Sequence, residues 1–174
     1  MKILIAYAGR GGATKECADL LAKRLSAHHT PLLCDAKSEP IPSPAEFDVV
    51  VLGSAIYFSR AHKTVKRYVK EYRDTLSNMP TAIFLVCGYP KQFDEYADIE
   101  FSKKLTCSLG IHSFGGELKP EKRSGLDKLI VRMMRSSILS QDFEESDDDH
   151  HPLPELLPEN INLLAEKIEK LGKI

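Results

Sequence analysis

The sequence predicts an α/β fold in which an open, doubly wound parallel sheet is covered by helices on both faces. Short runs rich in Val, Ile and Leu alternate along the chain with segments whose apolar residues recur at helical spacing. The apolar runs are continuous rather than alternating, which is typical of strands buried on both faces of a parallel sheet. Right-handed crossovers between such strands place helices on both faces of the sheet.

Five segments of the chain are expected to form the strands, because each is a short apolar run bounded by polar or turn-forming residues. They are KILIAY (2–7), PLLCD (31–35), DVVVLGS (48–54), TAIFLVC (81–87) and IHSFGGEL (111–118).

The links between these segments have different patterns. Helical stripes are predicted over 14–25, 65–76 and 161–171, and a weaker stripe over 102–109 precedes the fifth strand. The link AKSEPIPSPAEF at 36–47 is too rich in proline for a long helix.

Length and composition favour one domain spanning residues 1–174. The region at about 119–158 exceeds a minimal five-strand unit and is interpreted as an elaboration of that domain. It holds a basic, methionine-containing helix at 125–138 and an acidic stretch at 142–151. Metal binding by the acidic stretch is not expected, because an acidic run in a loop is usually solvated.

Charge and cysteine content exclude several classes of function. The net charge is -1, so no nucleic-acid partner is expected. The four cysteines lie far apart without a C-x-x-C pair, which indicates reduced thiols rather than a zinc or dithiol site. No apolar run approaches the ~20 residues that cross a bilayer. A cytoplasmic protein is expected, with peripheral contact at the inner face of the membrane left open.

The loop GRGGAT lies where the first strand should meet the first helix. A helix start offers free N–H groups and partial positive charge, and glycine lets the backbone wrap an anion closely. We therefore expect a phosphate site here, although a tight turn that needs glycine only for its geometry is the simpler alternative. The residues are Gly9, Arg10, Gly11, Gly12, Ala13 and Thr14.

Two nucleotide motifs were compared with this loop. The ATPase motif G-x-x-x-x-G-K-[ST] is absent. The dinucleotide motif G-x-G-x-x-G fits at Gly9 and Gly11, with Asp35 placed to bind a ribose, but Thr14 replaces the third glycine. An NAD site is therefore the weaker alternative.

The loop and the later segment VVVLGSAIYFSRAHKTVKRYV together resemble the flavodoxin-like superfamily. Within it, the order of GSAIYFSRAHKTVKRYVKEY, NMPTAIFLV and LDKLIVRMM resembles the bacterial quinone-linked protoporphyrinogen oxidase type. The resemblance implies strand order 2-1-3-4-5 and FMN as cofactor, with its phosphate on the first loop.

The resemblance also implies which residues hold the FMN ring, in two loops at the carboxyl ends of the third and fourth strands. They are Ser54, Ala55, Ile56, Tyr57 and Phe58 on one side, and Cys87, Gly88 and Tyr89 on the other. No catalytic side chain and no metal are expected, because flavin carries the redox chemistry. His62 is interpreted as a surface or capping residue, with contact to substrate or flavin as the alternative, and Cys87 as a buried structural thiol.

The implied function is oxidation of protoporphyrinogen IX with a quinone as acceptor, which would make the protein an FMN-dependent oxidoreductase. A flavodoxin-type electron carrier with a redox protein partner remains an alternative, as does a non-redox module. The helix at 125–138 could contact a membrane surface, although packing of its apolar stripe on the sheet is the favoured interpretation.

Overall fold

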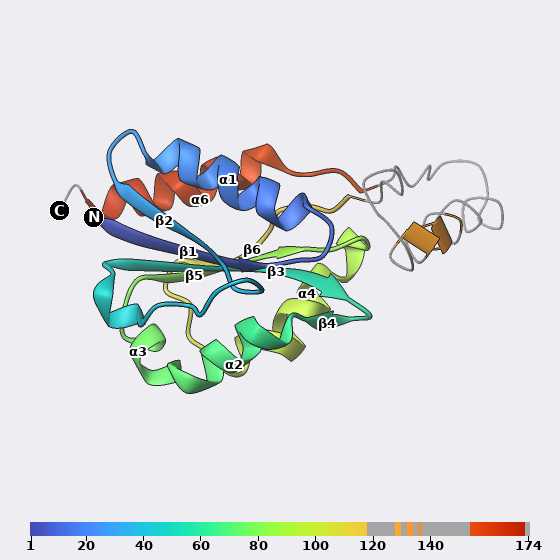
Figure 1. Cartoon of the computed structure of the whole chain (residues 1–174), viewed down its shortest axis with the longest axis horizontal. Coiled ribbons are helices and arrows are strands. Elements are labelled where there is room, and N and C mark those ends of the chain that lie inside the picture. The colour runs from blue at the N-terminus through green and yellow to red at the C-terminus, as the bar shows by residue number, and fades with distance from the viewer. Residues whose placement is uncertain (118–127, 130–131, 134–135, 137–153, 173–174) are drawn as a thin grey trace.

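The protein is an α/β/α sandwich in which one sheet separates two helical layers (Figure 1). The computed structural model describes residues 1–117, 128–129, 132–133, 136 and 154–172. The elaboration predicted at about 119–158, including the acidic stretch 142–151, lies mostly outside these residues.

The sheet has the predicted order. Its parallel strands run β2-β1-β3-β5-β6, which is 2-1-3-4-5 when only these strands are counted. They are β1 (Lys2–Ala8), β2 (Thr30–Asp35), β3 (Val49–Tyr57), β5 (Thr81–Val86) and β6 (Gly110–Ser113), and the short β4 (Arg60–Ala61) pairs antiparallel with β3. The carboxyl ends of β1, β3 and β5 therefore lie at one edge, as the ligand-site prediction requires.

Side chains of the central strands alternate between two hydrophobic cores. In β1, Ile3, Ile5 and Tyr7 join one core, whereas Leu4 and Ala6 join the other. This alternation is the two-residue period of an extended strand. Both faces are buried, which explains why the sequence shows continuous apolar runs.

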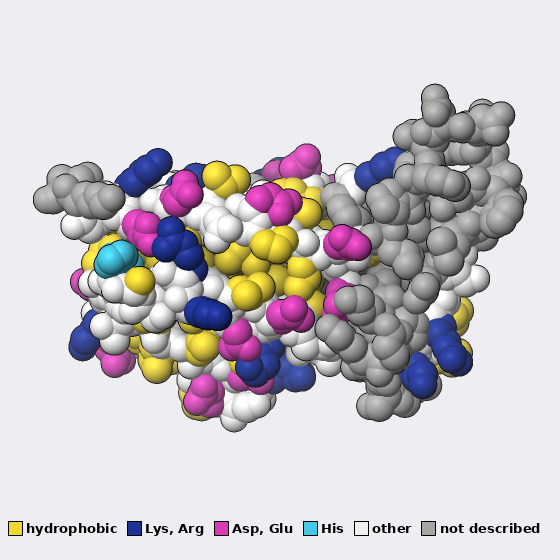
Figure 2. All heavy atoms as spheres, turned by 90° about the horizontal axis from the view of Figure 1, so that it is seen from above, with side chains coloured by type: hydrophobic (Ala, Val, Ile, Leu, Met, Phe, Trp, Pro, Cys, Tyr) yellow, Lys and Arg dark blue, Asp and Glu magenta, His cyan; other side chains and the backbone are white. Residues whose placement is uncertain are grey.

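One face of the sheet is covered by α1 (Ala13–Leu25) and α6 (Pro158–Leu171), which lie side by side (Figure 1). Their buried residues recur at helical spacing, as predicted. Figure 2 looks onto this face and shows charged side chains around a hydrophobic centre; Leu20 and Leu163 are exposed on it.

The other face is covered by shorter elements. They are the 3-10 turns η1 (Pro44–Glu46) and η2 (Pro90–Gln92), the helices α2 (Lys63–Glu71), α3 (Arg73–Ser77) and α4 (Phe93–Ala97), and the π-helical turn η3 (Asp98–Ser102). The predicted helix over 65–76 is interrupted at Tyr72, which caps both α2 and α3.

Three expectations about individual elements were wrong. The weak stripe over 102–109 is not a helix; the helical residues before β6 are 93–102. Strand β2 is largely exposed, with Leu32 and Leu33 47% and 36% accessible, because it is an edge strand followed by a proline-rich loop without a long helix. Strand β6 ends at Ser113, since Gly115 has a φ of 78°.

The predicted helix at 125–138 falls mainly outside the described residues. Leu129 and Met133, which are described and helical, are 55% and 64% exposed. The expectation that the apolar stripe packs on the sheet is therefore wrong for these two residues. Among the described residues, no helix is long and apolar enough to cross a membrane.

Candidate functional site

The first loop follows β1 and leads directly into α1. Gly9 packs against Thr14: a Cβ at Gly9 would lie 2.3 Å from Thr14 Oγ1. Thr14 is 3% exposed. Thr14 is β-branched, which argues against a dinucleotide site at this position. It fits here because Gly9 has no side chain, and the two ends of the loop therefore pack against each other.

Gly12 is the N-cap residue of α1 and has a φ of 92°. Side chains rarely adopt this conformation, so glycine is needed here for backbone geometry. Because Gly12 has no side chain, the N-cap position supplies no oxygen to the first N–H groups of α1. The helix begins at Ala13, so Thr14 lies in its first turn and is not the cap.

The loop after β3 is a tight hairpin closed by β4, with Ile56 opposite Ala61. At its tip, Phe58 and Ser59 have φ values of 49° and 58°. The left-handed backbone conformation costs a non-glycine residue about 1–2 kcal/mol, and here two such residues follow one another. Backbone strain of this kind concentrates where a chain holds a ligand. Phe58 is 75% exposed.

Ser54 and His62 hold the base of this hairpin. The buried Ser54 Oγ accepts a hydrogen bond from the His62 backbone N–H at 2.8 Å. The His62 side chain in turn caps α2, with Nδ1 accepting from Thr64 N–H at 3.3 Å. His62 is therefore a capping residue, as expected. Burial, assisted by Lys37, lowers the pKa of His62 below its usual value.

The loop after β5 is anchored by the chain that follows β6. Cys87 N–H donates to Gly115 O at 2.8 Å, and a Cβ at Gly116 would lie 1.9 Å from Cys87 O. Cys87 is 1% exposed, and burial raises its pKa to about 11. The thiol is therefore a structural group, as expected, and its backbone shapes the loop.

The two ring-binding loops predicted from the sequence meet at one pocket of about 240 Å³. This ring pocket is lined by Ile56, Tyr57, Phe58, Ser59, Cys87, Gly88, Tyr89 and Tyr96. Its volume is below the ~300 Å³ at which pockets for whole small-molecule ligands begin, so it suits part of a cofactor, such as a flat ring.

Two residues that line the ring pocket are not among those predicted from the sequence. Ser59 follows Phe58 at the hairpin tip. Tyr96 lies in α4, where it is 6% exposed and its hydroxyl donates to Gln92 Oε1. The spacing of Gln92 and Tyr96 at i and i+4 was the available signal, but only the fold brings α4 against the hairpin.

Arg10 connects the first loop to the ring pocket. Its guanidinium carbon lies 4.6 Å from the centroid of the Tyr57 ring, a cation–π contact. The Tyr57 ring also meets Phe58 edge-on at 4.7 Å. A cationic group thus stands between the uncapped helix start and the aromatic pocket. An anionic group on the first loop and an aromatic ring in the pocket fit this arrangement.

Asp35, which a dinucleotide site would use to bind a ribose, forms hydrogen bonds within the chain. Its carboxylate accepts a hydrogen bond from Lys37 N–H at 3.0 Å and from Ser38 Oγ at 3.3 Å. These bonds form a local turn after β2. The structure therefore weakens the NAD alternative at the residue that supported it. In the described part of the chain, no group of three His, Cys, Asp or Glu side chains could hold a metal ion.

Known families and proteins are similar to this chain. A family model described as a flavodoxin domain matches residues 4–145. Protoporphyrinogen IX dehydrogenase (quinone) of Escherichia coli K12 is 33% identical over 89 residues, which cover 49% of this chain and 48% of that protein. The protein of the same name from Leishmania major is 33% identical over 97 residues, covering 54% of this chain and 42% of that protein. The chain thus spans about half the length of these curated relatives or less.

Solved structures share the fold. The two-electron reduced flavodoxin of Megasphaera elsdenii superposes with a TM-score of 0.51 at 15% identity, covering 76% of this chain and 98% of that one. The rubredoxin oxygen:oxidoreductase of Desulfovibrio gigas superposes with a TM-score of 0.51 at 16% identity, covering 80% of this chain and 35% of that one.

Proposed function

This chain belongs to the flavodoxin-domain family of flavoproteins, and from that premise we propose that it binds FMN and acts as an electron-transfer oxidoreductase. The observation that carries the proposal is the ring pocket, in which the loops after β3 and β5 converge beside the first loop. The pocket combines aromatic side chains with loop backbone, a lining suited to a flat ring.

Each part of the site has a distinct task in this proposal. The backbone of Gly9–Thr14 binds the FMN phosphate at the start of α1, and Arg10 adds positive charge. Tyr57, Phe58 and Tyr89 pack against the ring. Ser54 and His62 keep the hairpin in position through their hydrogen bond. FMN, when bound, supplies the redox chemistry.

We propose protoporphyrinogen IX as the substrate and a quinone as the acceptor. The support is the name of the two relatives, whose similarity to this chain covers about half of it. In this proposal the protein contributes position and exclusion of water, since flavin accepts the electrons.

A carrier between protein partners is the second candidate, and one observation favours it. Phe58 is 75% exposed at the tip of the hairpin that lines the ring pocket, so a partner protein could reach the edge of the site. A carrier needs such an open edge, whereas an enzyme for a large substrate needs a cleft above it.

Peripheral membrane contact through residues 125–138 belongs to the same proposal. Leu129 and Met133 are exposed there, and so are Lys128 and Arg132. Apolar and basic side chains on one segment are typical of binding to an anionic membrane surface. Replacing Leu129 and Met133 with serine should reduce sedimentation of the full chain with phosphatidylglycerol vesicles.

The first experiment is FMN titration of the purified full chain, followed by gel filtration and an absorption spectrum, with NAD as the control. Retained flavin bands are expected, and retention of NAD instead would overturn the proposal. Quinone-dependent oxidation of protoporphyrinogen IX by the loaded protein then separates the enzyme from the carrier, which would exchange electrons with a flavodoxin reductase but not turn over the porphyrinogen.

A further inference from the structure

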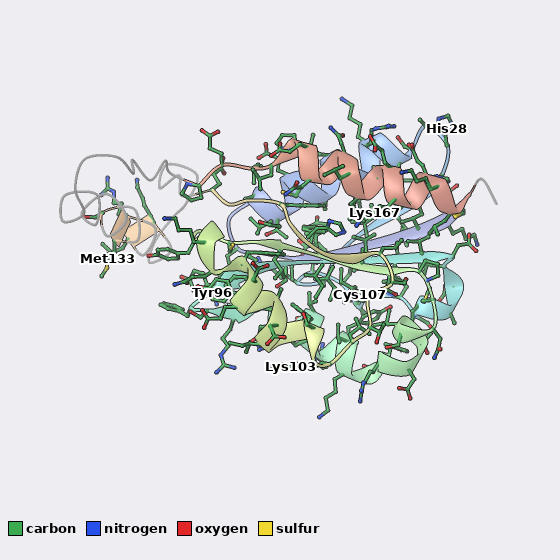
Figure 3. The ribbon with its side chains drawn as sticks, turned by 180° about the vertical axis from the view of Figure 1, so that it is seen from behind. His28, Tyr96, Lys103, Cys107, Met133 and Lys167 are labelled. Carbon is green, nitrogen blue, oxygen red and sulfur yellow. The ribbon has the colours of Figure 1, made fainter. Side chains whose placement is uncertain are left out.

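A second cavity, of about 480 Å³, lies between α2, α3 and the turn after η3. This basic cavity is lined by Lys66, Val69, Lys70, Arg73, Glu100, Lys103 and Lys104. It shares no lining residue with the ring pocket. Figure 3 shows Lys103 in the layer on the opposite side of the sheet from Lys167 of α6. Its volume is within the ~300–1,000 Å³ typical of small-molecule sites.

Cationic side chains predominate around the basic cavity. Five of its seven lining residues are cationic and one, Glu100, is acidic. The chain as a whole has a net charge of -1, so this concentration of cations is local. Cations gathered around a concave surface attract a ligand with several negative groups.

The single acidic residue offsets only part of this field, because the cations around the cavity outnumber it. Glu100 is 2% exposed, and its carboxylate lies 3.1 Å from Lys66 Nζ and 3.8 Å from Arg60 Nη1. A buried carboxylate needs such partners, since desolvation without them is costly. Glu100 therefore holds the Lys66 ammonium in place at the wall of the cavity.

The other cations around the basic cavity differ in whether they already have an ion-pair or hydrogen-bond partner. Lys103 pairs with Asp98 at 2.7 Å, and Lys104 Nζ donates to Ile99 O at 2.8 Å. An ammonium has three donors, so each retains capacity for another acceptor. In the described part of the chain, Lys70 and Arg73 have no acidic side chain within ion-pair distance. Both are exposed.

The cations come from more than one element, which favours a ligand with more than one anionic group. Lys66 and Lys70 are one helical turn apart, about 6 Å along the axis of α2. Lys103 and Lys104 approach from another element. A ligand with two linked phosphates can contact more of these side chains at once than a single phosphate can. Arg73 adds a planar fork that binds phosphate in a bidentate manner.

We propose that the basic cavity is a binding site for a compact ligand carrying at least two phosphate groups. Lys66, Lys70 and Arg73 contact it from the α2–α3 side, and Lys103 and Lys104 from the opposite side. The phosphates of a free small molecule and those of lipid headgroups share this chemistry. The basic cavity is separate from the first loop, Gly9–Thr14, and the proposal does not depend on flavin binding.

The test is calorimetric titration of the full chain with inorganic triphosphate, in the presence of excess FMN so that the first loop is occupied. The variant Lys70→Gln/Arg73→Gln should weaken binding about tenfold or more, because two charge-assisted contacts are lost. The matched control Lys23→Gln/Lys170→Gln removes two exposed cations from α1 and α6, on the other face of the sheet, and should bind as the unmodified chain does.

A second arm uses phosphatidylcholine vesicles with and without cardiolipin, whose headgroup carries two linked phosphates. Triphosphate binding that depends on Lys70 and Arg73 assigns the site to a free ligand, and vesicle binding with the same dependence and no triphosphate binding assigns it to headgroups. The proposal is wrong if neither probe binds at millimolar concentration and low salt, or if both double variants weaken binding equally. Unfolding midpoints of the variants show whether folding accounts for any loss.

Discussion

At the scale of single residues, the site depends on positions where the backbone leaves no choice of side chain. Gly9 and Gly12 occur in the same loop for different reasons. Gly9 makes room for Thr14, and Gly12 adopts a φ of 92° that other residues avoid. Among the described residues, nothing lies within 4 Å of a Cβ placed at Gly12, so its requirement is conformational rather than steric within the chain.

Gly12→Val should weaken FMN binding about tenfold or more, because altered N–H directions at the start of α1 remove at least one hydrogen bond to the phosphate. Gly110→Val is the matched control, since Gly110 also has a φ of 92° but lies at the start of β6, away from the loops. Both variants should lose about 1–3 kcal/mol of stability from the strained backbone. Fluorescence titration checks affinity, and equal FMN binding by both variants would contradict the phosphate assignment.

His62 should make stability depend on pH. Its folded pKa lies below the usual 6.5, because burial and nearby cations disfavour its charged form. The unfolded chain therefore binds the proton more readily, and the free energy of unfolding should decrease as pH falls below about 6.5. His29 and His112 shift in the same direction, for the same first cause of burial. Urea denaturation at pH 7.5 and 5.5 measures the difference.

The control is His62→Asn, which keeps an N-cap acceptor without titrating and should show a smaller loss of stability on acidification. His62→Ala should cost about 1 kcal/mol at pH 7.5, where the cap is intact in the parent. Greater stability of the parent at pH 5.5 than at pH 7.5 would refute the assignment.

At the scale of elements, the helical layer formed by α2, α3 and α4 contains ion pairs to one buried carboxylate. Lys66 from α2 and Arg60 from β4 converge on Glu100 of η3. The same contact connects the hairpin that lines the ring pocket to the wall of the basic cavity. The interruption at Tyr72 and the π-helical turn at η3 are departures from regular helix in this layer.

Lys66→Met should destabilise the protein by about 3 kcal/mol, because it leaves a buried carboxylate with only a distant partner. Lys70→Met, one turn along the same exposed edge of α2, should change stability by less than about 0.5 kcal/mol. Adding Glu100→Leu to Lys66→Met should recover most of the loss. Chemical denaturation of the parent, Lys66→Met, Glu100→Leu and the double variant completes the cycle, with Lys70→Met as the control outside it. No recovery in the double variant would argue against the pair.

At the scale of the whole molecule, two cores on either side of one sheet bury most of the thiols. Cys17, Cys34 and Cys87 are buried, and Cys107 is partly buried. Burial raises the pKa of Cys17 to about 12 and that of the other three to about 11. At pH 8 these thiols therefore remain protonated and weakly nucleophilic.

The folded protein should react slowly with the aromatic disulfide reagent DTNB at pH 8, whereas all four thiols should react within seconds to minutes in urea. A thiol that reacts rapidly in the native state would show that the cores open locally or that a cysteine is activated. Absorbance of the released thiolate provides the count. Saturation with FMN should slow the labelling of Cys87 further, since its loop lines the ring pocket.

The sequence by itself determined the parallel sheet and the three loops at its carboxyl edge, whereas the strand order was implied by the family resemblance. Buried parallel strands require continuous apolar runs, and strand-to-helix junctions require glycine, so both signals are local. Local patterns did not predict burial where it depends on which elements pack against a strand. The apolar run PLLCD predicts a covered strand, yet Leu32 and Leu33 are exposed because no helix follows them on that edge.

Only the tertiary structure decided which distant residues meet. It placed Tyr96 in the ring pocket, Arg10 against Tyr57 and Glu100 beside Lys66. None of these contacts has a periodic or motif-like signature. They arise because the parallel strands bring the loops that follow them to one edge of the sheet, and because α2, α3, α4 and η3 lie on the same face (Figure 1). Their side chains therefore share a surface that the linear order does not reveal.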